Sequence, residues 1–203
     1  MERSIPIRRS RQQRNNGGSA TPEHGNLMFG FTVFLLSESV VFLSFFVTYI
    51  ALRLASSHWF PSGFSGLDIT KPAINTVILV SSSFVIYFAE RALDRNHLHQ
   101  FRGLLLLTAV MGTYFLVGQA IEWRGLSFGL TTGLFGATFY LLTGFHGLHV
   151  LVGILLQVMV LLRSLTSHHA TPENHAGFSA IALFWHFVDV IWIVLFLLIY
   201  LWS

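Results

Sequence analysis

Five long apolar runs separated by short polar segments account for most of this chain. They are Leu27–Leu54, Pro72–Leu93, Phe101–Glu122, Thr131–Arg163 and Ala176–Trp202. Each run reaches the roughly 20 residues that an α-helix needs to cross the hydrocarbon core of a bilayer. The alternation of a barrel strand is missing, and a backbone in lipid must satisfy its own hydrogen bonds. The pattern therefore predicts an all-α protein, a polytopic membrane bundle of five transmembrane helices.

A polar segment, residues 1–26, precedes the first run. It carries five arginines followed by Asn, Gly, Ser, Thr and Pro residues. This composition predicts a disordered basic tail over 1–26, ahead of a single transmembrane domain over 27–203. The first apolar run is longer than the 7–15 residues of a signal-peptide core, so we expect the tail to remain on the mature protein.

The positions of Lys and Arg predict how the bundle is oriented. If the N-terminus is cytoplasmic, the five tail arginines join Arg91, Arg95, Arg102 and Arg163 on the inner side, which makes nine. The outer segments then hold only three basic residues: Arg53, Lys71 and Arg124. Because basic residues concentrate on the cytoplasmic side, we expect a cytoplasmic N-terminus and an external C-terminus.

Composition agrees with a membrane protein and argues against a disulfide or thiolate-metal protein and against a nucleic-acid-binding protein. Only 10% of the residues are charged and 53% are hydrophobic, whereas soluble proteins carry about 25% charged residues. Cysteine is absent, which excludes disulfides and thiolate metal ligands. The net charge of +3 includes the five tail arginines, so it indicates an orientation signal and no nucleic-acid partner.

Five ionisable residues lie near the middle of the apolar runs, where they are costly: Glu38, His146, His149, His186 and Asp189. Such residues inside a bilayer are functional or architectural candidates. The histidines of the fourth run are three residues apart, as are His186 and Asp189, so each pair shares one helix face. All five are expected at one depth.

Two further carboxylates, Glu90 and Glu122, lie close to the ends of their runs. Interfacial water can hydrate a carboxylate at that depth. We therefore interpret both as boundary residues.

Four interpretations compete for the five mid-run residues. A zinc or iron site has acceptable ligands, but the Glu-x-x-His motif that di-iron bundles repeat on two helices is missing. Haem ligation is weaker, because His146 and His149 lie on one helix and cannot sandwich a ring. A proton or ion path through Glu38 and Asp189 is the transporter alternative. An architectural network is the fourth, with Asp189 bonded to an imidazole as its simplest unit, and the residues alone favour it.

Several strings resemble those of one known family, subunit III of the haem–copper cytochrome oxidases. The two longest are Phe145-His-Gly-Leu-His-Val150 and Trp185-His-Phe-Val-Asp-Val-Ile-Trp192. Shorter matches, in the same order, are Ser37-Glu38-Ser39, Asn75-Thr76, Gln119-Ala120-x-Glu122 and His175-x-Gly177-Phe178. The resemblance extends over residues 27–202.

The resemblance implies a non-catalytic subunit of an oxygen-reducing, proton-translocating enzyme. In that family haem and copper reside in subunits I and II, so no catalytic, cofactor-binding or metal-ligating residue is expected here. The implied role is to pack directly on subunit I, with subunit II in the same complex, to bind phospholipid, and to support proton uptake and stability during turnover. Glu38 corresponds to the family's buried carboxylate. Arg163 corresponds to an arginine that contacts lipid phosphate, a task that suits a basic residue at a helix end.

The longer family members have seven helices, and two of them precede the helix with the glutamate. The present sequence resembles the short, five-helix bacterial form, which implies a multi-pass protein of the bacterial plasma membrane or of an internal energy-transducing membrane. Quinol oxidases also contain a five-helix subunit III, usually with Thr before His-Gly and Leu before Asp. Phe145 and Val188 at these positions favour the cytochrome c type, and the quinol type is the alternative.

Overall fold

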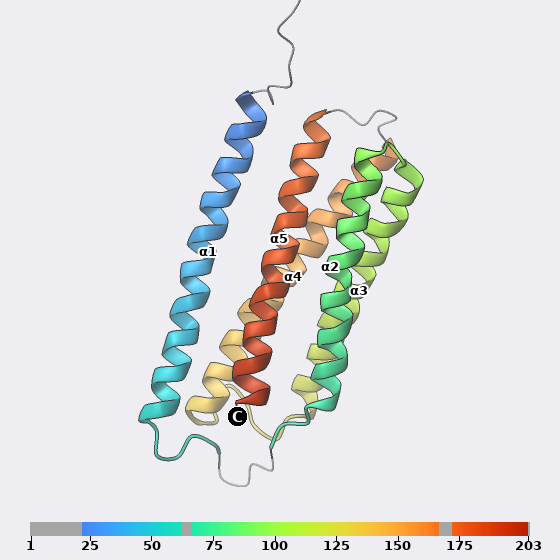
Figure 1. The fold of residues 1–203 in the computed structure, drawn as a ribbon. Helices are drawn as coiled ribbons and strands as arrows, with labels where there is room; N and C mark the ends of the chain where they lie inside the picture. The colour runs from blue at the N-terminus through green and yellow to red at the C-terminus, as the bar shows by residue number, and fades with distance from the viewer. Residues whose placement is uncertain (1–21, 62–65, 167–171, 203) are drawn as a thin grey trace, which may run out of the picture.

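The computed structural model describes residues 22–61, 66–166 and 172–202. It consists of five long helices that run up and down beside one another (Figure 1). They are α1 (Pro22–Ala55), α2 (Thr70–Asp94), α3 (Leu98–Gly125), α4 (Gly133–Thr166) and α5 (Pro172–Phe196), and the π-helical turn η1 (Leu197–Leu201) continues α5. All five helices are long and apolar enough to cross a membrane. The predicted all-α class and the five spans are confirmed.

The helices are longer than the apolar runs that predicted them. Trp123–Gly125, which follow the third apolar run, form the end of α3, and Ser164–Thr166, which follow the fourth, complete α4. The first helix begins at Pro22, inside the segment expected to be tail; residues 1–21 lie outside the described residues. A helix of 34 residues such as α4 extends about 51 Å at 1.5 Å per residue. Its ends therefore project beyond a hydrocarbon core of about 30 Å, where hydropathy gives no signal.

The last helix lies at the centre of the bundle and the first at its edge. In Figure 1, α5 stands between α1 and the α2–α3 pair, and α4 crosses behind it. The most apolar part of α5 is 44% buried, compared with 22% for α1, which packs against α5 and α4. Most of the outward surface of α1 is therefore apolar and exposed.

Two glycines allow α5 to sit at the centre. Trp185, which is fully buried, lies against Gly112 of α3 and Gly153 of α4. A Cβ at Gly112 would lie 2.5 Å from the indole, and one at Gly153 would lie 2.8 Å from it. Small residues let transmembrane helices approach closely, so these two positions admit the largest side chain of the core.

A tight hinge joins α2 to α3. The backbone N–H of His97 donates to the carbonyl of Ala92 and that of Asn96 donates to Leu93, both at 2.9 Å. This pair of bonds is the Schellman motif that closes a helix C-terminus. Its left-handed position is Asn96, with φ of 56°, and Asn tolerates that conformation better than most residues. The hinge therefore starts α3 immediately beside the end of α2.

Candidate functional site

The first mid-helix contact joins α1 to α4. Glu38 Oε2 lies 3.2 Å from His149 Nε2, and His149 Nδ1 lies 2.9 Å from the carbonyl oxygen of Phe145. A carbonyl only accepts, so Nδ1 carries a hydrogen. One further proton must then lie between Nε2 and Oε2, either on the imidazole as an ion pair or on the carboxyl group as a neutral pair. We call this contact the Glu38–His149 pair; its side chains are 21% and 12% exposed.

Aromatic rings surround this imidazole. The ring centroids of Phe42 and Phe145 lie 5.0 and 4.8 Å from that of His149, and Phe184 of α5 stacks on it at 6.2 Å. Within these apolar surroundings, the polar partner of His149 Nε2 is the carboxyl group of Glu38. The pair is therefore the polar link between α1 and the rest of the bundle at this depth.

The second mid-helix contact joins α2 to α5 through a residue that sequence reasoning missed. Ser83 Oγ donates to Asp189 Oδ2 and lies 3.1 Å from His186 Nδ1. The single hydroxyl hydrogen goes to the carboxylate, so Nδ1 of His186 donates to the oxygen. The direct bond expected between Asp189 and an imidazole is replaced by this bridge. The run of three serines, Ser81–Ser83, inside an apolar segment was the available signal.

His146 stands apart from both contacts. It is fully buried, and neither ring nitrogen has a hydrogen-bond partner among the described residues. Its ring packs against Phe115 and Trp192, with centroids 5.8 and 5.0 Å away. One face of α4 also contains Gln157, likewise fully buried and with both amide atoms unpartnered in the described part of the chain. The structure therefore distributes the five expected residues over three separate units.

Further hydrogen bonds extend the contact between α2 and α5 along both helices. Trp192 Nε1 donates to Thr76 Oγ1 at 2.9 Å, and Trp185 Nε1 donates to Ser82 Oγ at 2.8 Å. At the end near the hinge, Ser179 Oγ donates to Glu90 Oε1 at 2.6 Å. We call this set the α2–α5 seam: Thr76, Ser82, Ser83 and Glu90 of α2 with Ser179, Trp185, His186, Asp189 and Trp192 of α5.

The two carboxylates interpreted as boundary residues also bond neighbouring helices. Glu90 accepts the bond from Ser179, and Glu122 Oε1 accepts a 2.8 Å bond from the hydroxyl of Tyr200. Tyr200 belongs to η1. Trp202, the residue after η1, has its ring centroid 4.3 Å from the guanidinium of Arg53. Both side chains are half-buried near the ends of their helices, which agrees with boundary residues, and the bonds to neighbouring helices are what that interpretation missed. Hydropathy cannot tell a carboxylate that faces water from one that faces a neighbouring helix.

The remaining candidates concern lipid and metal. Arg163 is exposed in the last turn of α4, where it can reach a headgroup. Within the described ranges, no three His, Asp or Glu side chains are grouped so that they could hold a metal ion. The arrangement can therefore join helices and share protons within each unit, but the described residues offer no ligand set for a redox metal.

The sequence of this chain also matches a known family and several of its members. The model of the family described as cytochrome c oxidase subunit III matches residues 11–203. A protein named cytochrome c oxidase subunit 3 from Synechocystis is 45% identical over 187 residues, which cover 91% of this chain and 80% of the relative. Proteins of the same name from Thermostichus vulcanus and Mus musculus are 44% and 40% identical, over 86% and 87% of this chain and 86% and 70% of theirs.

Proposed function

The chain belongs to the family of cytochrome c oxidase subunit III, and from that premise we propose that it packs directly on subunit I, binds phospholipid, and supports proton uptake and stability during turnover. Membership makes it a multi-pass subunit of the oxidase complex, with subunits I and II as its partners. The redox chemistry belongs to those partners. The observation that carries the proposal is that the bonded mid-helix groups join helices, as Glu38 and His149 do.

Purification through a tag on this chain tests the proposal. The subunit alone should be colourless, and the intact complex should show the absorption of oxidase haems and consume oxygen with reduced cytochrome c. A stoichiometric haem or metal signal in the isolated subunit would contradict the non-catalytic role. If the chain came away as a homo-oligomer that carries protons or ions across liposomes, the transporter alternative through Glu38 and Asp189 would replace it.

The electron donor follows from the family. The relatives described above from two bacteria and a mouse are all named as cytochrome c oxidase subunits, which agrees with the expectation from Phe145 and Val188. The quinol alternative has no comparable support. The geometry likewise gives the transporter alternative none, because no hydrogen bond among the described residues links the Glu38–His149 pair to Asp189.

We also propose that the N-terminus is cytoplasmic, in a bacterial plasma membrane or an internal energy-transducing membrane. The hinge end of the bundle carries Arg91, Arg95, Arg102 and Arg163, which supports the expected excess of inner basic residues. The chain contains no cysteine, so single-cysteine variants give a clean test. Gln100→Cys should react with an impermeant maleimide only from the cytoplasmic side, and Ser57→Cys only from outside; the reverse pattern would overturn the orientation.

Arg163 is the proposed lipid-headgroup contact. It is exposed in the last turn of α4, which supports contact with the phosphate of a lipid in the adjacent leaflet. Replacing it with Gln in the intact oxidase should lower the amount of co-purifying anionic lipid, measured by mass spectrometry of the extracted lipid. Unchanged lipid content in the Arg163→Gln oxidase would remove this contact from the proposal.

A further inference from the structure

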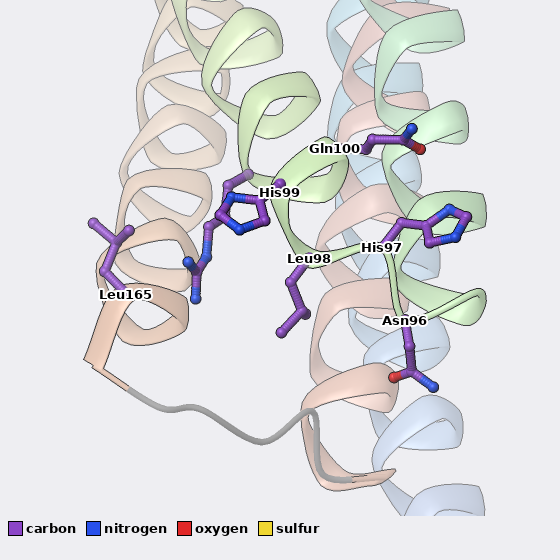
Figure 2. Close-up of a pocket in the computed structure, with 7 residues that line it drawn as sticks. Asn96, His97, Leu98, His99, Gln100 and Leu165 are labelled. Atoms are coloured by element: carbon purple, nitrogen blue, oxygen red, sulfur yellow. The ribbon is translucent and has the colours of Figure 1, made fainter.

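A cavity of about 680 Å³ opens where the α2–α3 hinge meets the end of α4 (Figure 2). Seven of the described residues line it: Asn96, His97, Leu98, His99, Gln100, Arg102 and Leu165. Three of these side chains carry or can acquire positive charge, two are amides, two are leucines, and none is a carboxylate. The lining therefore suits an anion that has an apolar part.

The lining side chains divide between two sides of α3. Figure 2 shows His99 on the side where Leu165 of α4 lies, whereas Asn96, His97 and Gln100 point the other way. His99 and Arg102 are three residues apart and so share a helix face. The side chains on the α4 side that can donate hydrogen bonds to an anion are therefore His99 and Arg102, with Leu98 and Leu165 as neighbouring apolar groups of the same cavity.

A contact with the backbone of α4 fixes Arg102 in this place. Its Nη2 donates to the carbonyl oxygen of Ser164, and its Nε is buried without a partner among the described residues. A guanidinium has five N–H donors in a rigid planar fork, and the bond to Ser164 uses one of them. Such a fork matches the oxygens of a phosphate group.

The first turn of α3 also favours an anion in this cavity. His97, at its N-cap, forms no side-chain cap, and the first N–H groups of a helix have no partner within it. These groups favour an anion. The backbone N–H groups of this turn therefore supplement Arg102 as donors to an anion in the cavity.

The depth of the cavity points to a lipid. It lies at the first residues of α3 and the last residues of α4, so either orientation of the bundle places it at the level of the headgroups. Basic pockets at such positions bind the headgroups of anionic lipids. We propose that this cavity binds the phosphate of an anionic phospholipid, held by Arg102 and His99, with the upper part of the lipid against Leu98 and Leu165.

This site is distinct from the one proposed at Arg163. Arg163 and Leu165 are two positions apart on α4, which places their side chains about 200° apart around the helix axis at about 100° per residue. The two sites can therefore fail independently. Loss of lipid from Arg163 variants alone would leave the present proposal intact, and loss from His99 variants alone would leave the other.

The test uses the whole oxidase in nanodiscs of phosphatidylcholine with or without phosphatidylglycerol. Native mass spectrometry counts the phosphatidylglycerol molecules that stay bound as the collision energy rises. His99→Gln and Arg102→Gln should each weaken the retention of one phosphatidylglycerol by about tenfold or more, the effect of losing one charged hydrogen bond. The matched controls His97→Gln and Arg95→Gln, from the same hinge, should retain it.

Two further measurements keep the result unambiguous. Arg102→Gln also removes the bond to Ser164, whereas His99→Gln leaves that bond in place, so an effect in both variants cannot come from a loosened α4. Broadening of the ³¹P resonance of inorganic phosphate by the detergent-solubilised complex, lost in Arg102→Gln, would reassign the site to free phosphate and overturn the lipid. Equal retention in the His99, Arg102 and His97 variants would overturn the site.

Discussion

The two mid-helix polar contacts differ in how their helices are held. The α2–α5 seam contains several hydrogen bonds along the length of the helices, and Asp189 at its centre is only 3% exposed. Among the described residues, one polar contact, the Glu38–His149 pair, joins α1 to α4, and Glu38 is 21% exposed. Lipid is as apolar as a Leu side chain, so packing and hydrogen bonds hold membrane helices together. We therefore expect α5 to form part of a rigid core and α1 to be the more separable helix.

The largest expected effect comes from the centre of the seam. Trp185→Ala removes a fully buried indole, its bond to Ser82 and its packing against Gly153. Large-to-small changes of this kind cost about 3–5 kcal/mol in protein cores. The midpoint for heat-induced loss of this subunit from the detergent-solubilised oxidase should fall sharply. Ile193→Ala, at an exposed position on the same helix, should leave it nearly unchanged; equal effects would contradict the seam as the core.

A smaller loss is expected for Asp189→Ala. It leaves the hydroxyl of Ser83 without an acceptor in a buried site, which costs about 1–3 kcal/mol. Asp189→Asn keeps an oxygen that can accept the same bond. The yield of assembled oxidase should therefore fall for Ala and be largely retained for Asn. If the Asp189→Ala oxidase assembled as well as wild type, the bridge through Ser83 would make no contribution to assembly.

Glu38→Gln should have a milder effect again. The amide can still bond His149, and the site is partly exposed. We expect the oxidase to assemble, with a modest loss of turnover measured as oxygen consumption with reduced cytochrome c. Complete loss of oxygen reduction in an intact complex would place Glu38 in the chemistry itself and would end the supporting role proposed for this subunit.

The smallest expected quantity is the coupling between the two contacts. Groups that share no partner usually have additive effects within about 0.3–0.5 kcal/mol. The loss of stability in the double variant Glu38→Gln/Asp189→Ala should therefore equal the sum of the losses in the two single variants. The measurement is the same thermal loss of the subunit from the oxidase. A larger coupling energy would show that the two contacts belong to one network.

The helices could be predicted from the sequence because lipid allows few alternatives to them. Their ends could not, since the end segments Trp123–Gly125 and Ser164–Thr166 lie beyond the hydrocarbon core, where hydropathy carries no signal. The hinge is similar: the left-handed Asn96 is typical of a C-cap, but its use becomes evident only when the bonds to Ala92 and Leu93 are seen.

The candidate site was predictable in its residues and not in its connections. The i, i+3 spacing correctly placed His186 and Asp189 on one face, but the partner on α2 depends on which of three consecutive serines faces α5. Ser81 bonds its own helix at Val77, and Ser82 accepts from Trp185, which leaves Ser83 as the bridge. A rotation of 100° decides between them. That angle is fixed by helix packing, to which a single sequence gives no access.

The π-helical turn at the end of α5 decides which way the side chain that follows it points. A π-helical turn contains one residue more than an α-helical turn, so the residues after it are rotated by about 100° from where an uninterrupted α-helix would place them. Tyr200, inside this turn, reaches Glu122 of α3, and Trp202, just after it, reaches Arg53 of α1. Winding the same residues as an α-helix would rotate Trp202 by about 100° away from Arg53, whereas deleting one residue within Leu197–Leu201 would let an α-helical turn leave Trp202 where it is. The π-helical turn therefore accommodates one extra residue while Trp202 stays beside α1.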